Sequence, residues 1–282
     1  CFGELLYIDG SVHAWFTLAP EARPTLLTVP DDATNRVLYA QFWEAESTRA
    51  VMTALRAVFR EFGLPMALYS DRTHWALHTP KATGPVDKQR LTQVGRALAR
   101  LGVEHIPAYS PQALGRSEGL NRTLQGRLVN ELRVAGITTI PAANAYLREI
   151  CLPEHNATFS RAPRDPEPAW VPIGDLDLDQ VLCHEEARVV SRDNTVTLDR
   201  VDLQLAKQPG RRTCAGLDVV VRRHLDGRHS VWRGPQRLGV HAAAGQEAPW
   251  LAWALLAAGI AVGAVYLRRQ ARRDAPMFPV DL

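Results

Sequence analysis

Three acidic residues stand where carboxylates could act together in chemistry. Asp9 follows the apolar run at residues 5–8, Asp71 comes shortly after the apolar run at 66–69, and Glu118 lies near the start of a segment with helical spacing. If the two runs are neighbouring strands, the aspartates lie side by side at the sheet edge, and a helix crossing that edge brings Glu118 to them. Three carboxylates from separate elements are typical of a site for hard divalent cations. Two such cations about 3.5–4 Å apart can activate a water or hydroxyl and stabilise the leaving oxygen of a phosphodiester.

Each of these acids also has a structural interpretation. Aspartates at strand ends commonly serve as turn and cap residues. Asp31 and Asp32, in the stretch DDATNR, are interpreted in this way. The three acids differ from that pair because a single strand order would bring all of them together.

The segment that contains Glu118 predicts a helix with two distinct faces. Leucines follow one sector and would pack on the sheet: Leu120, Leu124 and Leu128. At a helical rotation of about 100° per residue, four polar residues fall within one neighbouring sector: Glu118, Asn121, Arg122 and Gln125. Arg116 precedes this sector. Arg122 and Gln125 could bind phosphates or base edges beside the metals. The alternative is a solvated helix face.

The predicted elements of the first half follow the order β-β-β-α-β-α-β-α, which indicates an α/β fold. The expected strands are residues 5–8, 26–29, 37–42, 66–69 and 103–106. The expected helices are 47–62, 91–101, the segment of Glu118, and 144–150. Ser47 or Thr48 is a suitable N-cap for the first helix, and Gly63 a suitable end.

These elements predict a core domain over residues 1–160. The stretch RAPRDPEPAWVP is proline-rich, so an extended linker is expected over 161–186. Short strands are expected at 187–192, 195–206, 217–223 and 229–232, with a hairpin turn at Asp226 and Gly227. They predict a small β-barrel or sandwich over 187–243. This domain is rich in arginine, and Arg222 and Arg223 are expected to bind DNA.

Residues 250–267 form an uncharged apolar run, followed by Arg268, Arg269, Arg272 and Arg273. An apolar run of this length before a basic cluster predicts a transmembrane helix. The alternative is a buried or oligomer-forming helix.

Charge and cysteine content limit the remaining classes. A net charge of +3 is only a weak sign of a polyanionic partner. The four cysteines are scattered and form no CxxC pair, which argues against a structural zinc site and a disulfide framework. Reduced thiols of this kind are typical of a cytosolic protein.

Several stretches together resemble a known family: LLYIDGSVHAWF, VPDDATNRVL, LPMALYSD, LTQVGRALARLGVEHIPAYSPQALGR and LNRTLQGRLVNELR. From Cys1 to about Val240, the chain is similar to the integrase-type DDE transposases of bacterial insertion sequences, in the group catalogued as ISNCY. The resemblance implies an RNase H-like catalytic core, with a mixed five-stranded sheet and helices, followed by a small β-barrel. The apolar segment at 250–267 is not a feature of that family.

The resemblance also implies roles for single residues. Asp9, Asp71 and Glu118 match the DDE triad, with Asp9 bridging two Mg²⁺ or Mn²⁺ ions and the other two acids each holding one. Arg122 and Gln125 match positions that face DNA in such enzymes. The residues expected to bind DNA are therefore Arg116, Asn121, Arg122, Gln125, Arg222 and Arg223.

The chain departs from the family where SPQALGRSEG stands in place of SPQAKGRVER. Leu114 replaces a lysine, Ser117 a valine and Gly119 an arginine. The loss of two cations predicts weaker binding of the DNA backbone and a flatter salt dependence. The family's N-terminal helix-turn-helix region does not appear before Cys1, so recognition of terminal inverted repeats is expected outside this chain.

We interpret the chain as the catalytic and barrel portion of a transposase, which would cut element ends by water attack and join the 3′-hydroxyl to target DNA. The expected partners are insertion-sequence ends, target DNA and further copies of the chain. The expected location is the cytoplasm, at the nucleoid, with membrane contact through residues 250–267 as an open alternative. Two other functions stay open: a metal-dependent nuclease of the same fold, and an inactive or membrane-tethered DNA-binding remnant.

Overall fold

The computed structural model describes residues 1–71, 73–76, 91–108 and 115–243. The chain divides into unit 1 (Cys1–Cys183) and unit 2 (His184–Leu282), which are described separately. The apolar segment predicted at 250–267 lies outside the described residues. Within the described ranges, no helix has the length and apolar character needed to cross a membrane.

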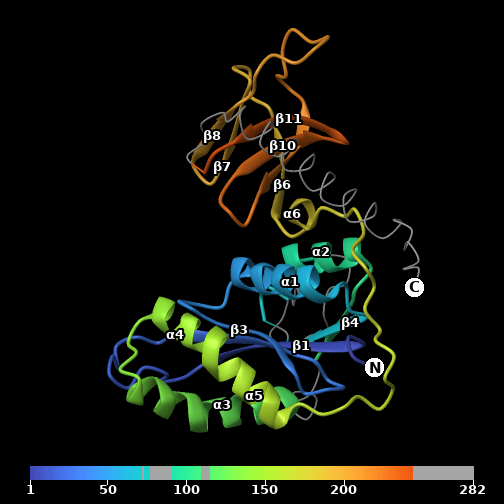
Figure 1. Cartoon of the computed structure of the whole chain (residues 1–282). Coiled ribbons are helices and arrows are strands. Elements are labelled where there is room, and N and C mark those ends of the chain that lie inside the picture. Colours follow the sequence, from blue (N-terminus) through green and yellow to red (C-terminus); the bar gives the residue numbers. More distant parts are fainter. Residues whose placement is uncertain (72, 77–90, 109–114, 244–282) are drawn as a thin grey trace, which may run out of the picture. The chain divides into compact units, whose positions relative to one another are not determined.

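Unit 1 is built on a mixed five-stranded sheet with the strand order β3-β2-β1-β4-β5 (Figure 1). The first three strands form an antiparallel meander, whereas β4 runs parallel to both β1 and β5. The strands are β1 (Leu5–Val12), β2 (Thr25–Pro30), β3 (Val37–Trp43), β4 (Ala67–Ser70) and β5 (Glu104–Pro107). A mixed five-stranded sheet with helices was the expected core, and this prediction is confirmed.

Helices cover both faces of this sheet (Figure 1). One face carries α1 (Thr48–Phe62) and α2 (Gln93–Leu101), and the other carries α3 (Gly115–Val134), α4 (Ile140–Tyr146), the π-helical turn η2 (Leu147–Cys151) and α5 (Leu152–Phe159). The predicted N-cap of α1 is confirmed, because Ser47 Oγ accepts a hydrogen bond from the backbone N–H of Ala50 at 3.2 Å. Gly63 follows Phe62 with φ 105°, a conformation that glycine adopts without strain.

The hydrophobic face of α3 holds that helix on the sheet. Leu124, Leu128 and Leu132 are buried and pack in one cluster with Trp15 and Phe42. The predicted packing of the leucine sector is therefore correct. Because this sector is fixed, the neighbouring polar sector of α3 is directed along strand β1.

Strand β1 is longer than predicted and has two chemically different faces. It continues past Asp9 because residues 9–12 pair with residues 25–28 of β2. Leu6 and Ile8 are buried on one face, while Asp9 and Ser11 accept hydrogen bonds from side chains of α3 on the other. Asp9 is therefore a mid-strand residue on the α3 face, not a residue of the turn after the strand.

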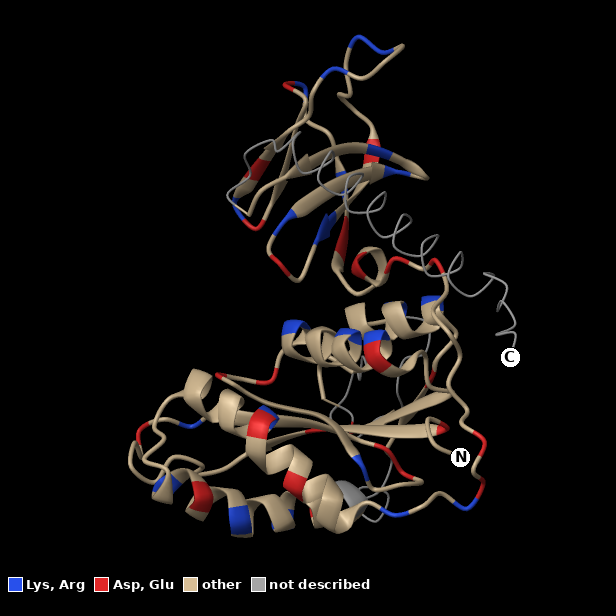
Figure 2. Cartoon of the chain, in the orientation of Figure 1, with Lys and Arg blue, Asp and Glu red and all other residues tan. Residues whose placement is uncertain are grey.

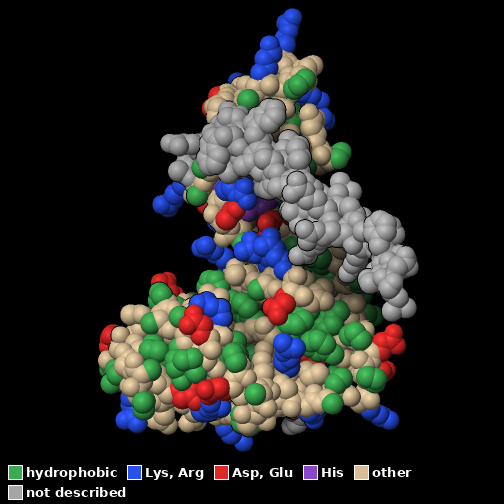
Figure 3. Space-filling view, in the orientation of Figure 1, with side chains coloured by type: hydrophobic (Ala, Val, Ile, Leu, Met, Phe, Trp, Pro, Cys, Tyr) green, Lys and Arg blue, Asp and Glu red, His purple; other side chains and the backbone are tan. Residues whose placement is uncertain are grey.

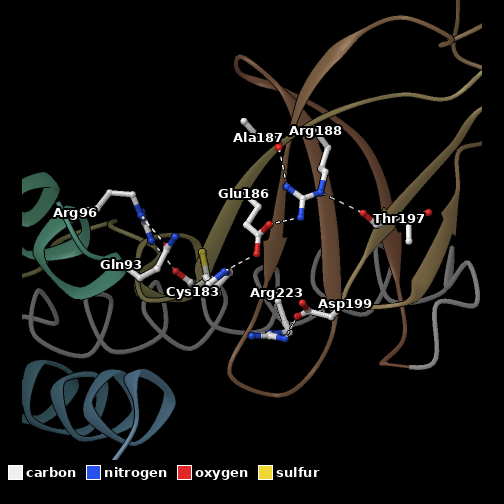
Figure 4. A network of polar contacts seen from close by, with 10 residues as sticks. Gln93, Arg96, Cys183, Glu186, Ala187, Arg188, Thr197, Asp199 and Arg223 are labelled. Carbon is white, nitrogen blue, oxygen red and sulfur yellow. Dashed lines mark hydrogen bonds and ion pairs between the residues drawn. The ribbon is translucent and has the colours of Figure 1, made fainter. Parts of the chain in front are cut away.

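The proline-rich segment predicted as a linker is extended and packs on unit 1. Val171 forms an isolated β-bridge with Leu64. The Trp170 ring contacts Phe2 and Phe62, with centroids 5.4 and 5.5 Å apart. The segment ends in α6 (Leu178–Val181). Arg96 of α2 donates to the carbonyl oxygen of Val181, the last residue of this short helix. It also donates to the carbonyl oxygen of Cys183 (Figure 4).

The described part of unit 2 contains six strands in two sheets, and these strands do not close into the expected barrel. A four-stranded sheet has the order β11-β10-β9-β6, and β7 and β8 pair with each other. The strands are β6 (His184–Val189), β7 (Thr195–Leu198), β8 (Val201–Gln204), β9 (Asp218–Arg223), β10 (His229–Arg233) and β11 (Gln236–His241). The barrel prediction is wrong for the described strands, because β6 and β11 stand at opposite edges of their sheet and closure requires that no edge remain.

The two sheets of unit 2 share one core and several polar ties. Val196 and Leu203 of the hairpin pack with Val221 and Val231 of the larger sheet. Arg188 of β6 donates to Glu186 and to the carbonyl oxygen of Thr197, and Arg223 of β9 pairs with Asp199 at the β7–β8 turn (Figure 4). The arrangement is a small sandwich, which was the second of the two expected architectures.

The β7–β8 hairpin was predicted as one strand over residues 195–206. Asp199 and Arg200 form its turn with φ 50° and φ 66°. Two central residues with positive φ define the tight turn that suits a twisted hairpin, and glycine or asparagine usually supplies them. Without such residues the sequence carries no turn signal here, whereas Gly227 correctly predicts the β9–β10 turn.

Candidate active site

Asp9 and Asp71 come from neighbouring parallel strands. The β1–β4 ladder ends with the pair Ile8 and Ser70, and each aspartate is the next residue of its segment. The prediction that these two strands are neighbours is confirmed. Both carboxyl groups therefore belong to one region of the sheet edge.

The electrostatics of Asp9 reflect this proximity. The pKa of Asp9 is raised to about 6, chiefly by burial and also by the negative charges of Asp71 and Glu46. A hydrogen bond from Asn121 Nδ2 to Asp9 Oδ2, 2.8 Å long, opposes the rise because it stabilises the ionised form. Near neutral pH the site therefore holds carboxylates that repel one another.

The polar face of α3 meets β1 at two successive side chains. Asn121 contacts Asp9, and one helical turn later Gln125 Nε2 donates to Ser11 Oγ at 3.0 Å. Arg122 lies between them in the sequence and is exposed. The predicted polar sector thus divides in two: its amides bind the strand, and its arginine faces solvent.

Glu118 lies three residues before Asn121 on α3, with an exposed side chain. Residues three apart occupy the same side of a helix, so Glu118 is on the side that faces Asp9. Among the described residues, no three Asp, Glu, His or Cys side chains are close enough together to hold a metal ion. The structure thus brings Asp9 and Asp71 together, and leaves Glu118 at the rim. The side chain of Arg116 lies outside the described part of the chain.

A fourth acid, Glu46, was missed by the sequence analysis. It lies between β3 and α1, and its Oε1 accepts a 2.5 Å hydrogen bond from Nε1 of the buried Trp75. Burial raises the pKa of Glu46, and the nearby charge of Asp71 adds to the rise. In the sequence Glu46 merely precedes the N-cap of α1, so only the folding of α1 and β4 onto one sheet reveals its place.

A histidine supports the backbone beside Asp71. Ser70 Oγ lies 2.8 Å from His105 Nε2 of β5 and donates to the carbonyl oxygen of Asp71 at 2.8 Å. Burial lowers the pKa of His105 to about 4. The ring is therefore neutral at physiological pH, where one of its nitrogens can accept a hydrogen bond.

The donor set fits a hard divalent cation. Asp9 and Asp71 supply carboxylate oxygens, which such ions prefer. Asn121 Oδ1 is buried and has no hydrogen-bond partner among the described residues, so one more oxygen beside Asp9 lacks a donor. A cation would also relieve the repulsion that raises the pKa of Asp9. These features support metal binding at this edge of the sheet.

The two arginines predicted to bind DNA from unit 2 have partners within that unit. Arg222 Nε lies 2.8 Å from Glu185 Oε1, its side chain is 11% exposed, and its guanidinium stacks on Trp232 at 4.8 Å. Arg223 pairs with Asp199. Both side chains therefore stabilise the sandwich. More exposed cations lie in the loop between β8 and β9, at Lys207, Arg211 and Arg212.

Comparison with known proteins relates the chain to transposases. No family model matches it. It is 35% identical over 236 residues to "Putative transposase y4bF" of Sinorhizobium fredii, covering 83% of this chain and 51% of that protein. It is 34% identical over 145 residues to "Transposase for insertion sequence IS1202" of Streptococcus pneumoniae, covering 51% of this chain and 30% of that protein. The chain thus spans at most about half the length of these two relatives.

One solved structure with a similar chain is a simian T-cell lymphotropic virus intasome in complex with the PP2A regulatory subunit B56 gamma. The identity is 13% and the TM-score 0.43, over 81% of this chain and 72% of that chain. The two sequence matches include proteins named as transposases from two different bacteria. The resemblance to transposases of bacterial insertion sequences, predicted from the sequence motifs, is thereby confirmed.

Proposed function

We propose that the chain carries the catalytic core of a DDE transposase, which cuts the ends of an insertion sequence and joins them to target DNA. The observation that carries this proposal is the placement of Asp9 and Asp71 on adjacent parallel strands, with Asn121 of α3 bonded to Asp9. The sequence similarity to transposases supports it. Two Mg²⁺ or Mn²⁺ ions would be the cofactors.

Asp9, Asp71 and Glu118 would hold the metals. When bound, divalent cations supply an activated oxygen nucleophile and neutralise charge on the leaving oxygen. Asn121 fixes the rotamer of Asp9 through its 2.8 Å hydrogen bond. Ser70 fixes the backbone at Asp71, and His105 in turn lies at hydrogen-bond distance from Ser70. These residues hold their carboxylates in place before substrate arrives, which is how positioning lowers the barrier of phosphoryl transfer.

The remaining residues would bind DNA. Arg122 is exposed between the two amides that bind β1, so its guanidinium is available to a phosphate beside the acids. Arg116 would act at the start of the same helix. Gln125 has a different part in the described structure, since its amide is bonded to Ser11. Further copies of the chain on paired DNA ends would complete the assembly.

In unit 2 the β8–β9 loop is the better candidate for DNA backbone contact. Its base is anchored by Asn194, whose Oδ1 accepts from Thr213 Oγ1 and from the backbone N–H of Cys214 at 2.7 and 2.6 Å. Gly210, with φ 72°, lies at a turn of this loop. Blue side chains project from the tip of unit 2 in Figure 3, and Figure 2 shows basic residues along its loops. Exposed arginines on a fixed loop suit sequence-independent phosphate binding.

The test uses the purified chain and supercoiled plasmid DNA. Nicking of a plasmid can be measured without knowing the end sequences of the element. Mg²⁺- or Mn²⁺-dependent nicking is expected, and Asp9→Asn, Asp71→Asn and Glu118→Gln should each abolish it while the fold persists. Glu21→Gln, an exposed acid between β1 and β2, is the matched control and should cut normally. Sequencing for joined products separates a transposase from a nuclease of the same fold. Full activity of Asp71→Asn would contradict the proposal.

A DNA-binding remnant without catalysis is the second candidate. It is favoured by the exposed position of Glu118 and by the lack of a three-acid cluster among the described residues. Titration with Mg²⁺, followed by thermal stability, separates the two. A remnant would gain no stability from Mg²⁺, whereas a functional site should be stabilised in the unsubstituted chain and not in Asp9→Asn.

A further inference from the structure

We propose that Glu46 is a positioning residue of this site, which clamps the segment carrying Asp71 against the strand carrying Asp9. The clamp would hold the two aspartates at the separation that a divalent cation needs. This inference rests on the proposed function, because it assigns Glu46 a part in preparing the same pair of acids. Neither the similarity to transposases nor the sequence motifs single out this residue.

One arm of the clamp is the hydrogen bond to Trp75. Nε1 of Trp75 donates to Glu46 Oε1 at 2.5 Å, and the indole is 2% exposed. Trp75 lies four residues after Asp71, beyond the end of β4. A buried, charge-assisted hydrogen bond is stronger than one between neutral groups. It therefore ties Trp75, a residue beyond the end of β4, to the connection between β3 and α1.

The other arm is close packing on Gly10. A Cβ atom at Gly10 would collide with Oε2 of Glu46, so the carboxylate rests directly on the backbone of β1. Gly10 is the residue after Asp9. Any side chain at this position would push Glu46 away from the strand, and the absence of one lets the clamp close.

The clamp lies just beyond the end of the β1–β4 ladder. The ladder between β1 and β4 ends at Ile8 and Ser70, one residue before each aspartate. Beyond that pair, the described contacts between the two segments include the path from Gly10 through Glu46 to Trp75. Two carboxylates that repel each other would separate without such a restraint. A cation site assembled in advance loses less free energy on binding than one that must be ordered.

The experiment compares Glu46→Gln, Glu46→Ala and Trp75→Phe at pH 8, where Asp9 is ionised. Glutamine keeps the length of the side chain and can still accept from the indole, so Glu46→Gln should retain Mg²⁺ affinity within about threefold. Glu46→Ala and Trp75→Phe each break the clamp and should weaken Mg²⁺ binding about tenfold. In other metal sites, the loss of one group that orients a metal ligand has an effect of about this size. Affinity is measured by calorimetric titration with Mg²⁺ alone.

A spectroscopic readout follows the clamp itself. The NMR resonance of the Trp75 indole N–H proton is assigned in the ¹⁵N-labelled chain by its loss in Trp75→Phe. This resonance should lie downfield in the unsubstituted chain and move upfield in Glu46→Ala. Glu44→Ala and Ser47→Ala are the matched controls. Glu44 is an exposed acid of the same connection, and Ser47 caps α1 by accepting a hydrogen bond from the backbone N–H of Ala50. Both should leave the Trp75 signal and the Mg²⁺ affinity unchanged.

Three outcomes would overturn the inference. Unchanged Mg²⁺ affinity in folded Glu46→Ala would show that the clamp does not prepare the site. An equal loss in Glu46→Gln and Glu46→Ala would assign the effect to charge and not to positioning. A similar loss in Ser47→Ala would make it a general loosening of α1. If the unsubstituted chain binds no Mg²⁺ and nicks no DNA, the proposed function fails together with the inference about Glu46. In the first three outcomes the unsubstituted chain still binds Mg²⁺, so only the inference about Glu46 fails.

Discussion

The side-chain amide of Asn121 lies 2.8 Å from Oδ2 of Asp9, so helix α3 and strand β1 meet at the central acid of the candidate active site. This hydrogen bond opposes the rise in the pKa of Asp9 that burial and Asp71 cause. It therefore keeps a partly buried carboxylate available for a cation.

Asp9→Asn should stabilise the metal-free chain. The pKa of Asp9 is raised from 3.8 to about 6 in the folded protein. The folded state therefore keeps a proton that the unfolded state has released, and stability falls as the pH rises from about 4 to about 6. The gain in Asp9→Asn should approach at most ~3 kcal/mol above pH 7 and vanish near pH 4. Thermal melts with a chelator at pH 4 and pH 8 measure it, and a gain independent of pH would contradict the assignment.

Asn121→Ala should move the acid limb of the pH–activity profile to higher pH. The lost hydrogen bond is one that lowers the pKa of Asp9, so the carboxylate would need a higher pH to ionise. Gln125→Ala is the control, because Gln125 bonds Ser11 on the same face of α3 and not an acid. It should cost about 1 kcal/mol of stability and leave the profile in place. Nicking rates between pH 5.5 and 9 test both variants, and equal profiles would remove Asn121 from the site.

His105 should make unit 1 less stable in acid. Its pKa is lowered from 6.5 to about 4 by burial. The unfolded chain binds a proton at this position more readily, so stability is lost as the pH falls from 6.5 through 4. The full effect is at most ~3 kcal/mol. The free energy of unfolding, measured with denaturant at pH 7 and pH 4.5, should differ less between the two pH values in His105→Gln than in the unsubstituted chain. His74 is exposed, so His74→Gln should show the same difference as the unsubstituted chain.

Arginines of unit 2 should separate into stabilising and DNA-binding groups. Arg222→Ala removes the partner 2.8 Å from Glu185 and the ring contact with Trp232, and should cost about 1–3 kcal/mol of stability. The pair Arg211→Ala and Arg212→Ala should leave stability unchanged. It should reduce the slope of log K against log salt by up to ~2, since each lost phosphate contact contributes about 0.9. Fluorescence anisotropy of duplex DNA between 50 and 200 mM salt distinguishes the groups. Normal DNA affinity in the double variant would exclude the loop.

Trp170→Ala should destabilise unit 1, although Trp170 lies in the segment predicted as a linker. Its ring packs against Phe2 and Phe62, so truncation leaves a cavity and should cost about 3 kcal/mol. Val171→Ala is the neighbouring control, because Val171 is 47% exposed and bonds through its backbone. Urea unfolding of both variants measures the difference. Equal urea midpoints for the two variants would show that the segment predicted as a linker does not stabilise unit 1.

The amino-acid sequence by itself determined the elements whose signals are local. Ser47 and Gly63 mark the ends of α1 because a cap and a positive φ depend on neighbouring backbone only. The leucine spacing of α3 predicted its buried face for the same reason. The places of Asp9, Asp71 and Glu118 beside predicted strands and on a predicted helix singled out these acids, and the expected adjacency of the first two followed from one strand order.

Only the tertiary structure decided which side chains meet these acids. Asn121 and Gln125 have equal places on the helix face, yet one bonds Asp9 and the other Ser11, since the offset of α3 along β1 depends on packing. Glu46 is 25 residues before Asp71 in the sequence. It approaches Asp71 through Trp75 only after α1 and β4 pack on the same sheet. The closed barrel failed for a similar reason, because strand patterns report local alternation, and the pairing of sheet edges is a long-range contact that no local pattern encodes.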